Sequence, residues 1–572
     1  MLKNQTVGAS PALLPNRAAA DYNIKTAQRY LCMPAGQLTI KQLLETASSN
    51  STICIPRGVY LTDSICLKNK CNLHIDAFGV VLVFSDYTKT AITLENCKNI
   101  AVHGLTIDHV EPANTQGDVL STEPKSLVWQ AHKGFVQNLC SEEKFFVPNG
   151  ISPPGEGFRK GQLRPFTDLG FSRVEPTGQV GTFKLYGENC DRMCVGDTVV
   201  FRGKAAYVNH FIGCENITYE NVTILNGSGF AIMERDGVGN TLLNRVMITP
   251  GPKPQTAERE RLVSTCDATH SANMRKGICV KNSVFEKMTD DAANIHSYFG
   301  RVQHYNHIQK TLFYTTGTKN YGTINAPFQT GDELLLFSHE EQLYLKTKTL
   351  SPTSAAGENL YTVTVELPEN MKLTGNEILQ NMSATGNGFL YENCIVENNR
   401  SRGFLIKASH GCIRNCTFKD NGMSAILIKP EIPDGWGECG YVNGLTIENN
   451  ILENSGFFTG SDLHSAINIE ADSRHPLLMH KNILIRGNFF GRRYTRFAVC
   501  ACDVNGISIC GNTFEGRVRA YNELFDGEYN KLYPDDDAPV IYLRNVRVDA
   551  LENNVYPKSV KNPIVLSGDI AT

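Results

Sequence analysis

The chain has 572 residues, and its net charge of −3 and pI near 6.5 give no electrostatic reason to expect a nucleic acid or an anionic membrane as partner. The N-terminus lacks the apolar core of a signal peptide, and no apolar run reaches the roughly 18 residues of a membrane span. Eighteen cysteines without a CxxC pair are too few for a disulfide scaffold and provide no zinc knuckle. We therefore expect a soluble monomer or homodimer that is either intracellular or, with its signal peptide absent from this sequence, secreted or periplasmic.

In chain order, residues 1–36 are a polar leader, and a short amphipathic helix is predicted near residues 38–47. Strands rich in β-branched and apolar residues begin at Ile53 and continue to Asp108. The helix is well placed to cover the open end of these strands, which would otherwise expose core and strand edges to solvent.

Two stretches interrupt the strand pattern, residues 110–205 and 301–386. Each contains a Gly-Asp turn next to apolar strand residues, at 195–201 and 330–337. Because loops of this length rarely lack structure of their own, we predict two small antiparallel β-barrel inserts that resemble each other and wall the site. The resulting organisation is a leader (1–36), an N-terminal cap with the first coils (37–109), the first insert, catalytic coils (206–300), the second insert and C-terminal coils (387–572).

A short strand unit recurs in the second half of the chain, in which Asn, Cys or Ser precedes an apolar or β-branched pair. The unit begins at Ser283, Cys394, Cys416, Asn450, Asn488, Asn512 and Asn554. Spacings of 22 residues (394 to 416) and 24 residues (488 to 512) match one coil of a solenoid, and a second column aligns 292–296, 403–407, 425–429 and 466–470. Such strands must pair with the next coil, and amides at a corner can stack about 4.8 Å apart. The sequence therefore predicts an all-β fold, a right-handed parallel β-helix like that of pectate lyase.

Three aspartates are separated by one coil. Asp267 precedes Asp290 by 23 residues and Asp291 by 24. On adjacent coils their mutual repulsion would raise at least one pKa, so that an acid and a base coexist near neutral pH. An inverting glycosidase needs such a pair, about 6.5 to 9.5 Å apart, with a water between base and sugar. An isolated Asp-Asp pair is more often a turn cap, and the spacing favours catalysis.

Six further residues are candidate sugar ligands because of their place in the repeat or in the loop near 436: Asn294, His296, Lys407, Lys429, Trp436 and Glu438. His296 is equally well explained as a hydrogen-bonded neighbour of the acids, and the lysines as solvated residues. An exposed tryptophan beside a carboxylate is a common sugar platform. Since His270, His296 and the aspartates form no compact ligand motif, we expect no metal and no cofactor.

The segments 264–267 and 289–291 are similar to the catalytic segments of polygalacturonases. More closely, 103–108, 115–117, 262–270, 275–277 and 288–296 resemble the bacterial α-1,3-galactosidases of glycoside hydrolase family 110, with 262–296 the specific part. The resemblance implies an exo-acting, inverting hydrolase that releases terminal α-1,3-linked galactose, including that of blood group B, without a cofactor. It implies Asp267, Asp290 and Asp291 as catalytic carboxylates, with Asp290 the general acid. His270 and Arg275 are candidate sugar ligands because they lie in segments that resemble this family. The run 275–278 departs from the Arg-Arg-Gly-Pro expected there. This difference bears on which linkage and aglycone the enzyme prefers.

Other functions stay open at this stage. A polygalacturonase-like hydrolase would act on another glycan with the same acids. A pectate-lyase-like enzyme would use a basic residue, for which Lys407 and Lys429 are candidates, and usually calcium. A non-catalytic glycan-binding β-helix would keep the fold without the acids. Free galactose, an unsaturated sugar or no product would distinguish the galactosidase, the lyase and the binding protein.

Overall fold

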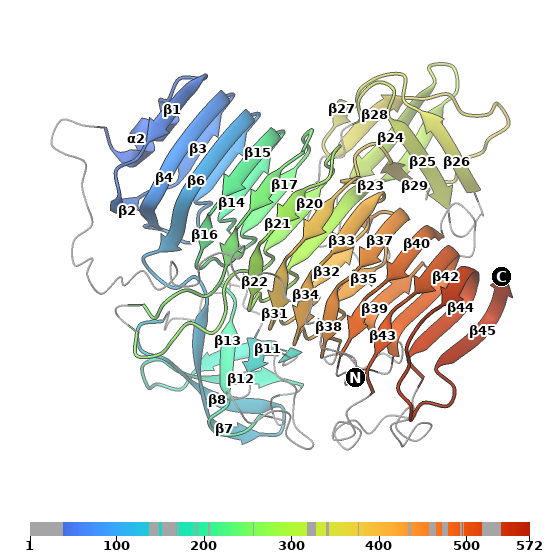
Figure 1. Ribbon diagram of the computed structural model, residues 1–572. Coiled ribbons are helices and arrows are strands. Elements are labelled where there is room, and N and C mark those ends of the chain that lie inside the picture. The colour runs from blue at the N-terminus through green and yellow to red at the C-terminus, as the bar shows by residue number, and fades with distance from the viewer. Residues whose placement is uncertain are drawn as a thin grey trace.

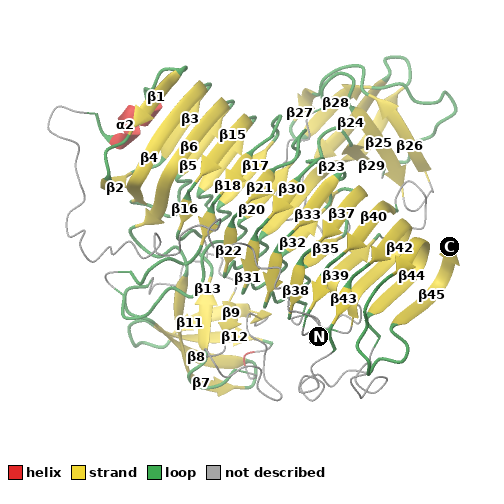
Figure 2. Ribbon diagram, viewed as in Figure 1, coloured by secondary structure: helices red, strands yellow, loops and turns green. Residues whose placement is uncertain are grey.

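The structure is a computed structural model that describes residues 38–135, 148–151, 167–168, 171–188, 190, 193–203, 206–254, 257–316, 328–338, 343–375, 377–432, 436–456, 465–471, 479–491, 495, 497–516 and 539–571. The predicted leader at 1–36 lies outside these residues. Almost all regular structure is strand, as predicted (Figure 2). No helix in the described ranges is long and apolar enough to cross a membrane.

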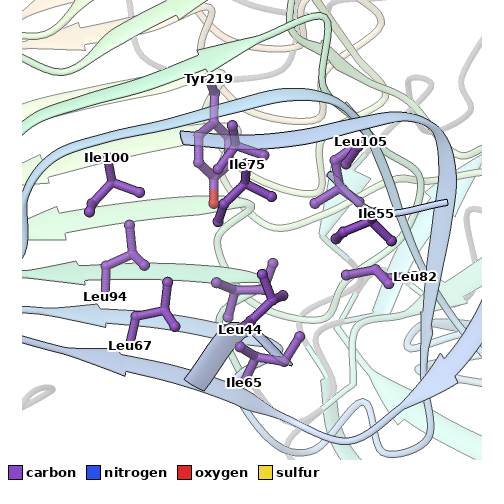
Figure 3. Close-up of a pocket in the computed structure, with 13 residues that line it drawn as sticks. Leu44, Ile55, Ile65, Leu67, Ile75, Leu82, Leu94, Ile100, Leu105 and Tyr219 are labelled. Atoms are coloured by element: carbon purple, nitrogen blue, oxygen red, sulfur yellow. The ribbon is translucent and has the colours of Figure 1, made fainter. Parts of the chain in front are cut away.

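The helix predicted near 38–47 is confirmed as α2 (Ile40–Glu45). It begins at a capping box in which the Gln42 N–H donates to the Thr39 hydroxyl (3.1 Å) and the Thr39 N–H donates to the Gln42 side chain (3.0 Å). Ile40 and Leu44 are buried in the solenoid core. In Figure 3 Leu44 faces the same apolar interior as Ile65, Leu67, Leu94 and Ile100 of the first coils.

The strands of the solenoid stack in three parallel columns, one per face of the solenoid (Figure 1). The first column contains β3 (Ile65–Lys68), β5 (Ile92–Glu95), β14 (Asn209–Ile212), β17 (Ile232–Arg235), β20 (Thr269–Ala272), β23 (Ala293–Asn306), β32 (Phe404–Ile406), β35 (Ile426–Ile428), β39 (Ser465–Glu470), β42 (Phe497–Cys510), β44 (Ile541–Glu552) and β45 (Ile564–Ala571).

The second column contains β1 (Ser51–Cys54), β4 (Cys71–Phe84), β6 (Lys98–His109), β15 (Glu215–Glu220), β18 (Leu242–Asn244), β21 (Cys279–Lys281), β30 (Leu390–Glu392), β33 (Gly411–Arg414), β37 (Asn443–Glu448), β40 (His480–Arg486) and the ends of β42, β44 and β45. The third contains β2 (Gly58–Thr62), the ends of β4 and β6, β16 (Thr223–Ile224), β19 (Met247–Ile248), β22 (Val284–Glu286), β31 (Ile395–Glu397), β34 (Thr417–Lys419), β38 (Ile451–Glu453), β41 (Phe489–Phe490) and β43 (Thr513–Phe514).

The registers confirm the repeat predicted from the sequence. In the first column Ala293 pairs with Phe404, and Phe404 pairs with Ile426. In the third column Ile395 pairs with Thr417, as the unit spacing requires. Because β23 pairs with β20 before the second insert and with β32 after it, the coils on either side of that insert form one continuous parallel β-helix.

The predicted side-chain ladder is present at the corner before the third column. The Nδ2 groups of Asn450, Asn488 and Asn512 each donate to the Oδ1 of the next asparagine at 3.0 Å, ending at Asn554. The same Oδ1 atoms accept backbone N–H groups from the preceding asparagines at 2.9 Å. Each amide therefore joins neighbouring coils by both backbone and side chain.

Replacing Asn488 by Ala is expected to lower the free energy of unfolding by about 2 kcal/mol, because its buried partners Asn450 and Asn512 lose hydrogen bonds. Chemical denaturation measures the effect. The control is Asn482→Gly, which removes a solvent-exposed rung-to-rung bond to Asn443 at a position whose φ of 53° glycine accepts. Equal losses in the two variants would contradict the ladder's contribution.

Both interruptions contain antiparallel strands, as predicted. The first is a sheet in the order β10 (Thr167–Asp168), β9 (Pro148–Ile151), β13 (Thr198–Phe201), β7 (Thr115–Glu123), β8 (Ser126–Ala131), β12 (Thr182–Gly187) and β11 (Phe171–Pro176). The second joins the end of β23 to β24 (Thr311–Thr316), β25 (Glu333–Ser338), β26 (Leu343–Lys348), β27 (Ser354–Gly357), β28 (Leu360–Thr364) and β29 (Ile378–Asn381). A bridge between Thr349 and Val365 closes the second sheet on itself, while no closing pair occurs among the described residues of the first.

The inserts leave the solenoid at opposite ends of first-column strands (Figure 1). The first insert lies between the end of β6, in the third column, and β14, in the first. The second insert continues directly from β23. The outward side of the first column therefore has one insert at each of its edges.

Candidate active site

The three predicted aspartates lie together, in the turns that lead into β20 and β23. The Ala268 N–H donates to the Asp291 carbonyl and the Asp290 N–H to the Cys266 carbonyl, both at 3.1 Å, which stacks one turn on the other. The Asp291 N–H also donates to Asp267 Oδ1 at 3.3 Å. Oxygens of Asp267 and Asp290 approach within 4.8 Å, closer than the usual spacing of inverting pairs.

The three carboxylates differ in their access to solvent. The side chain of Asp290 is 29% exposed, against 5% for Asp267 and 4% for Asp291. Only Asp290 therefore offers appreciable surface to an approaching molecule.

Arginines contact two of the aspartates. Arg202 Nη1 lies 3.1 Å from Asp290 Oδ2, and Arg400 Nη2 lies 3.1 Å from Asp290 Oδ1. Burial opposes ionisation of Asp290, but Arg400, Arg202 and Arg402 together hold its pKa below the ordinary value. Arg402 pairs with Asp291 at 3.1 Å, yet burial raises the pKa of Asp291. Asp290 is thus the most strongly ionised of the three.

Two histidines continue from Asp267. His270 Nδ1 lies 2.8 Å from Asp267 Oδ2, and His270 Nε2 lies 2.8 Å from His296 Nε2. Burial raises the pKa of Asp267 to about 7, and His270 opposes that rise. Burial works against a charged His270, but its hydrogen bond to Asp267 raises its pKa above the ordinary value. Burial lowers the pKa of His296 to about 3, so His296 is neutral.

A fully buried lysine lies on the other side of His296. Lys407 Nζ lies 2.8 Å from Glu438 Oε2 and 3.0 Å from Glu431 Oε2. Burial opposes its charge, but the two glutamates raise its pKa. Asn294 donates to Glu438 Oε2 at 3.0 Å. Lys407 is therefore a fixed cation between two carboxylates.

Glu438 is held in place by the short strand β36 (Glu438–Cys439), which pairs antiparallel with β23. Cys439 Sγ lies 3.0 Å from the Gln380 side-chain oxygen, on the second insert, and Gln380 donates to Ser297 at 3.1 Å. A Cβ at Gly440 would lie only 1.8 Å from the Lys407 carbonyl oxygen, so this approach requires glycine. The second insert thus supports the segment that carries Glu438.

The charges of this site balance. With every group in its ionised form there are five cations and five anions: Arg202, His270, Arg400, Arg402 and Lys407 against Asp267, Asp290, Asp291, Glu431 and Glu438. Buried charges are tolerated when each is paired, and here every one contacts an opposite charge. Removing a charge that is its partner's one opposite-charge contact among the described residues, as Lys407 is for Glu438, therefore leaves that partner uncompensated.

His270, His296 and Glu438 present atoms within 4.8 Å of one another and could in principle surround a metal ion. Their donor atoms are already engaged, since the two imidazoles bond to each other and Glu438 pairs with Lys407. A fixed ammonium group 2.8 Å from Glu438 also repels a cation. These residues do not fit a metal, and we assign none to them.

Two predicted ligands form ion pairs with acids other than the three aspartates. Arg275 makes a bidentate pair with Asp332 of the second insert (2.8 and 2.9 Å), and Lys429 pairs with Glu470 at 3.4 Å. Trp436 is 44% exposed at the start of the β36 segment, and residues 433–435 of its loop lie outside the described residues. A sugar-binding role for these three stays a prediction.

Sequence reasoning missed Arg202, Arg400, Arg402 and Glu431. Arg202 directly follows β13, where the first insert returns to the solenoid, and no repeat spacing points to it. Arg400 and Arg402 lie one coil after the Asp290–Asp291 pair once the second insert is set aside, as the pairing of Asp291 with Arg402 N–H (2.9 Å) shows. Deleting the insert from the repeat count could have found them.

The chain matches no protein-family model. It is 22% identical to "Alpha-1,3-galactosidase B" of Akkermansia muciniphila over 77% of its own length, spanning about half (54%) of that protein. It is 24% identical to "Alpha-1,3-galactosidase A" of Shewanella woodyi (77% of this chain, 73% of that protein) and 22% identical to "Alpha-1,3-galactosidase A" of Bacteroides fragilis (94% and 89%).

Among solved structures, the endo-xylogalacturonan hydrolase from Aspergillus tubingensis covers 93% of this chain and 95% of its own at 9% identity, with a TM-score of 0.40. A catalytic domain of a GH87 alpha-1,3-glucanase covers 95% and 68% at 11% identity, with a TM-score of 0.39. In sequence, the chain is related over most of its length to proteins named alpha-1,3-galactosidase, and this relationship supports a glycoside hydrolase.

Proposed function

We propose that this protein is an exo-acting, inverting glycoside hydrolase that releases terminal α-1,3-linked galactose from glycans, of blood group B type, linear type or both. The observation that carries the proposal is the stack of Asp267, Asp290 and Asp291 on adjacent coils, inside a balanced cluster of charges, in a chain related to alpha-1,3-galactosidases. Paired carboxylates of unequal pKa are the machinery that glycoside hydrolysis needs.

The exposure of the three aspartates supports a division of roles. Asp290 is the only one with accessible surface, so it is the group that can reach the glycosidic oxygen as general acid. Asp267 and Asp291, linked by the 3.3 Å bond, would hold and activate the water. The arginines favour ionised Asp290 in the free enzyme, and a sugar that covers its exposed face would remove solvent and raise its pKa.

Two polar atoms beside the acids are buried in the free protein and would meet a substrate only after the side chains around them move. Asn294 Oδ1 and Arg402 Nε have no hydrogen-bond partner among the described residues, although both atoms are buried. An unsatisfied buried amide oxygen is costly, and a sugar hydroxyl could donate to it. Asn294 also lies beside His270 in the strand register, next to the proposed base.

The charge of Lys407 argues against the lyase alternative. A proton-abstracting lysine must be neutral, whereas Glu431 and Glu438 raise the pKa of Lys407 and keep it charged. A polygalacturonase-like hydrolase on another glycan shares the same carboxylates, and the sugar that is released distinguishes it from a galactosidase.

Incubation with α-1,3-galactosyl oligosaccharides is expected to release free galactose, whose first-formed anomer in proton NMR is the β form. Inversion follows when water attacks the face opposite the departing oxygen. Initial α-galactose would indicate a retaining mechanism, which the short approach of Asp267 to Asp290 would then explain. Galacturonic acid release from a polygalacturonate substrate, without galactose release from the galactosyl oligosaccharides, would instead favour the polygalacturonase-like function.

A further inference from the structure

The charged side chains around the aspartates form a closed circuit of contacts that begins at Asp267 and ends at Asp291. Its links in order are Asp267 to His270 (2.8 Å), His270 to His296 (2.8 Å), His296 to Glu438 (3.7 Å), Glu438 to Lys407 (2.8 Å), Lys407 to Glu431 (3.0 Å), Glu431 to Arg402 (3.2 Å) and Arg402 to Asp291 (3.1 Å). The Asp291 N–H donates to Asp267 Oδ1 at 3.3 Å, which closes the circuit.

The hydrogen-bond partners of His296 determine where the protons lie. His296 Nδ1 is 3.2 Å from the carbonyl oxygen of Ser297, which can only accept, so Nδ1 carries the proton. A neutral His296 then has no proton on Nε2, so this atom must accept a hydrogen bond from His270 Nε2–H. His270 uses its Nε2–H for the hydrogen bond to His296, and its Nδ1 faces Asp267.

The geometry points to His296 as a positioning residue that keeps Asp267 ionised. By accepting from His270 Nε2, it allows His270 to carry protons on both nitrogens and to face Asp267 as an imidazolium. No contact joins His296 to any of the three aspartates among the described residues, so it acts through His270. The inference rests on the proposed function, in which Asp267 must be ionised to activate water.

Other groups facing His270 fit this charge state. Glu438 from β36 favours the imidazolium and Lys407 opposes it, while the Phe230 ring stacks on the imidazole with centroids 4.2 Å apart. Facing Asp267, Asp290 and Asp291 both oppose its ionisation, while His270 favours it by hydrogen bond and charge and Arg202 favours it by charge alone. The effect of His270 on Asp267 is therefore the one that His296 controls.

The test is the pH dependence of kcat/KM in two His296 variants on an α-1,3-galactoside. In the wild type kcat/KM should fall as the pH drops through the pKa of Asp267, about 7. His296→Leu removes the acceptor, so His270 loses its charge, the pKa of Asp267 rises, and this limb moves up by about one pH unit or more. His296→Gln retains an acceptor oxygen and should keep the limb within about 0.3 pH units of the wild type.

His210→Leu is the matched control, because His210 lies in the same column, two coils before His270 and three before His296, and contacts Arg235 rather than the aspartates. Its limb should coincide with that of the wild type. A His296→Leu enzyme with lower kcat but an unmoved limb would overturn the inference, and so would equal shifts in His296→Leu and His296→Gln.

Nitrogen-15 NMR of histidine-labelled wild-type protein gives a second readout that requires neither a stable variant nor activity. At pH 7 His270 should show two protonated nitrogens and His296 only a protonated Nδ1. A neutral His270 would overturn the inference even in an active galactosidase. If no galactoside is hydrolysed, the proposed function fails, while the NMR pattern still decides the charge state.

Discussion

Replacing Asp267 or Asp291 by Asn is expected to lower kcat/KM by about 1,000-fold on both a natural α-1,3-galactosyl disaccharide and an activated aryl α-galactoside. Water must be activated whatever group departs, so neither substrate escapes the loss. Asp290→Asn is expected to lose about 1,000-fold on the disaccharide and less than about 10-fold on the aryl substrate, whose leaving group needs little protonation. Steady-state kinetics with the two substrates measure these ratios.

Asp236→Asn is the control for these variants, because Asp236 pairs with Arg235 at 2.8 Å outside the trio and should keep both activities. Azide is expected to restore turnover of the aryl substrate in the base variants, since it attacks without deprotonation. If Asp290→Asn were dead on both substrates while Asp267→Asn kept the aryl activity, the roles would be reversed. That result would agree with the arginines that favour ionised Asp290. Full activity in all three variants would show that these aspartates do not catalyse the reaction.

Lys407→Met is expected to lower the free energy of unfolding by about 3 to 5 kcal/mol, because it leaves buried Glu438 without its cation and deprives Glu431 of one of two. Thermal and chemical denaturation measure the loss. Activity should fall with it, because Glu438, which faces His270 and His296, loses the ammonium group that holds it in place. Adding Glu438→Gln to Lys407→Met should recover part of the stability by removing the unpaired charge.

Lys429→Met provides the matched control, because Lys429 lies in register one coil further on and pairs with partly exposed Glu470 at 3.4 Å. Its loss should be below about 1 kcal/mol, as for other exposed pairs. Equal stability of Lys407→Met and the wild type would contradict the assignment of Lys407 as a buried cation between two carboxylates.

The fold could be predicted from the sequence because the coils of a β-helix repeat similar residues at a regular spacing. Stacked coils repeat the same environment, so the alignment of 292–296 with 403–407 coincides with the observed register. The aspartates were found for the same reason, since Asp267 and Asp291 differ by one coil.

The rest of the site has no such period. Arg202 reaches Asp290 from the end of an insert, and Glu431 lies just before a loop of irregular length. Arg275 was a reasonable sugar ligand by its place after Asp267, yet Asp332 of the second insert binds its guanidinium. Such partners depend on how an insert folds back on the solenoid, which the repeat does not encode.

The stacking of coils also bears on how the protein matures during synthesis. Each coil contacts mainly its neighbours, so coils can add one after another as the chain leaves the ribosome. The circuit around the aspartates, however, draws on residues from Asp267 to Glu438, and the cation Lys407 is buried against two acids that follow it in the chain. A nascent chain that ends between Lys407 and Glu431 therefore holds all three aspartates but leaves Lys407 without either of its carboxylates, and activity should arise as a single late event rather than coil by coil.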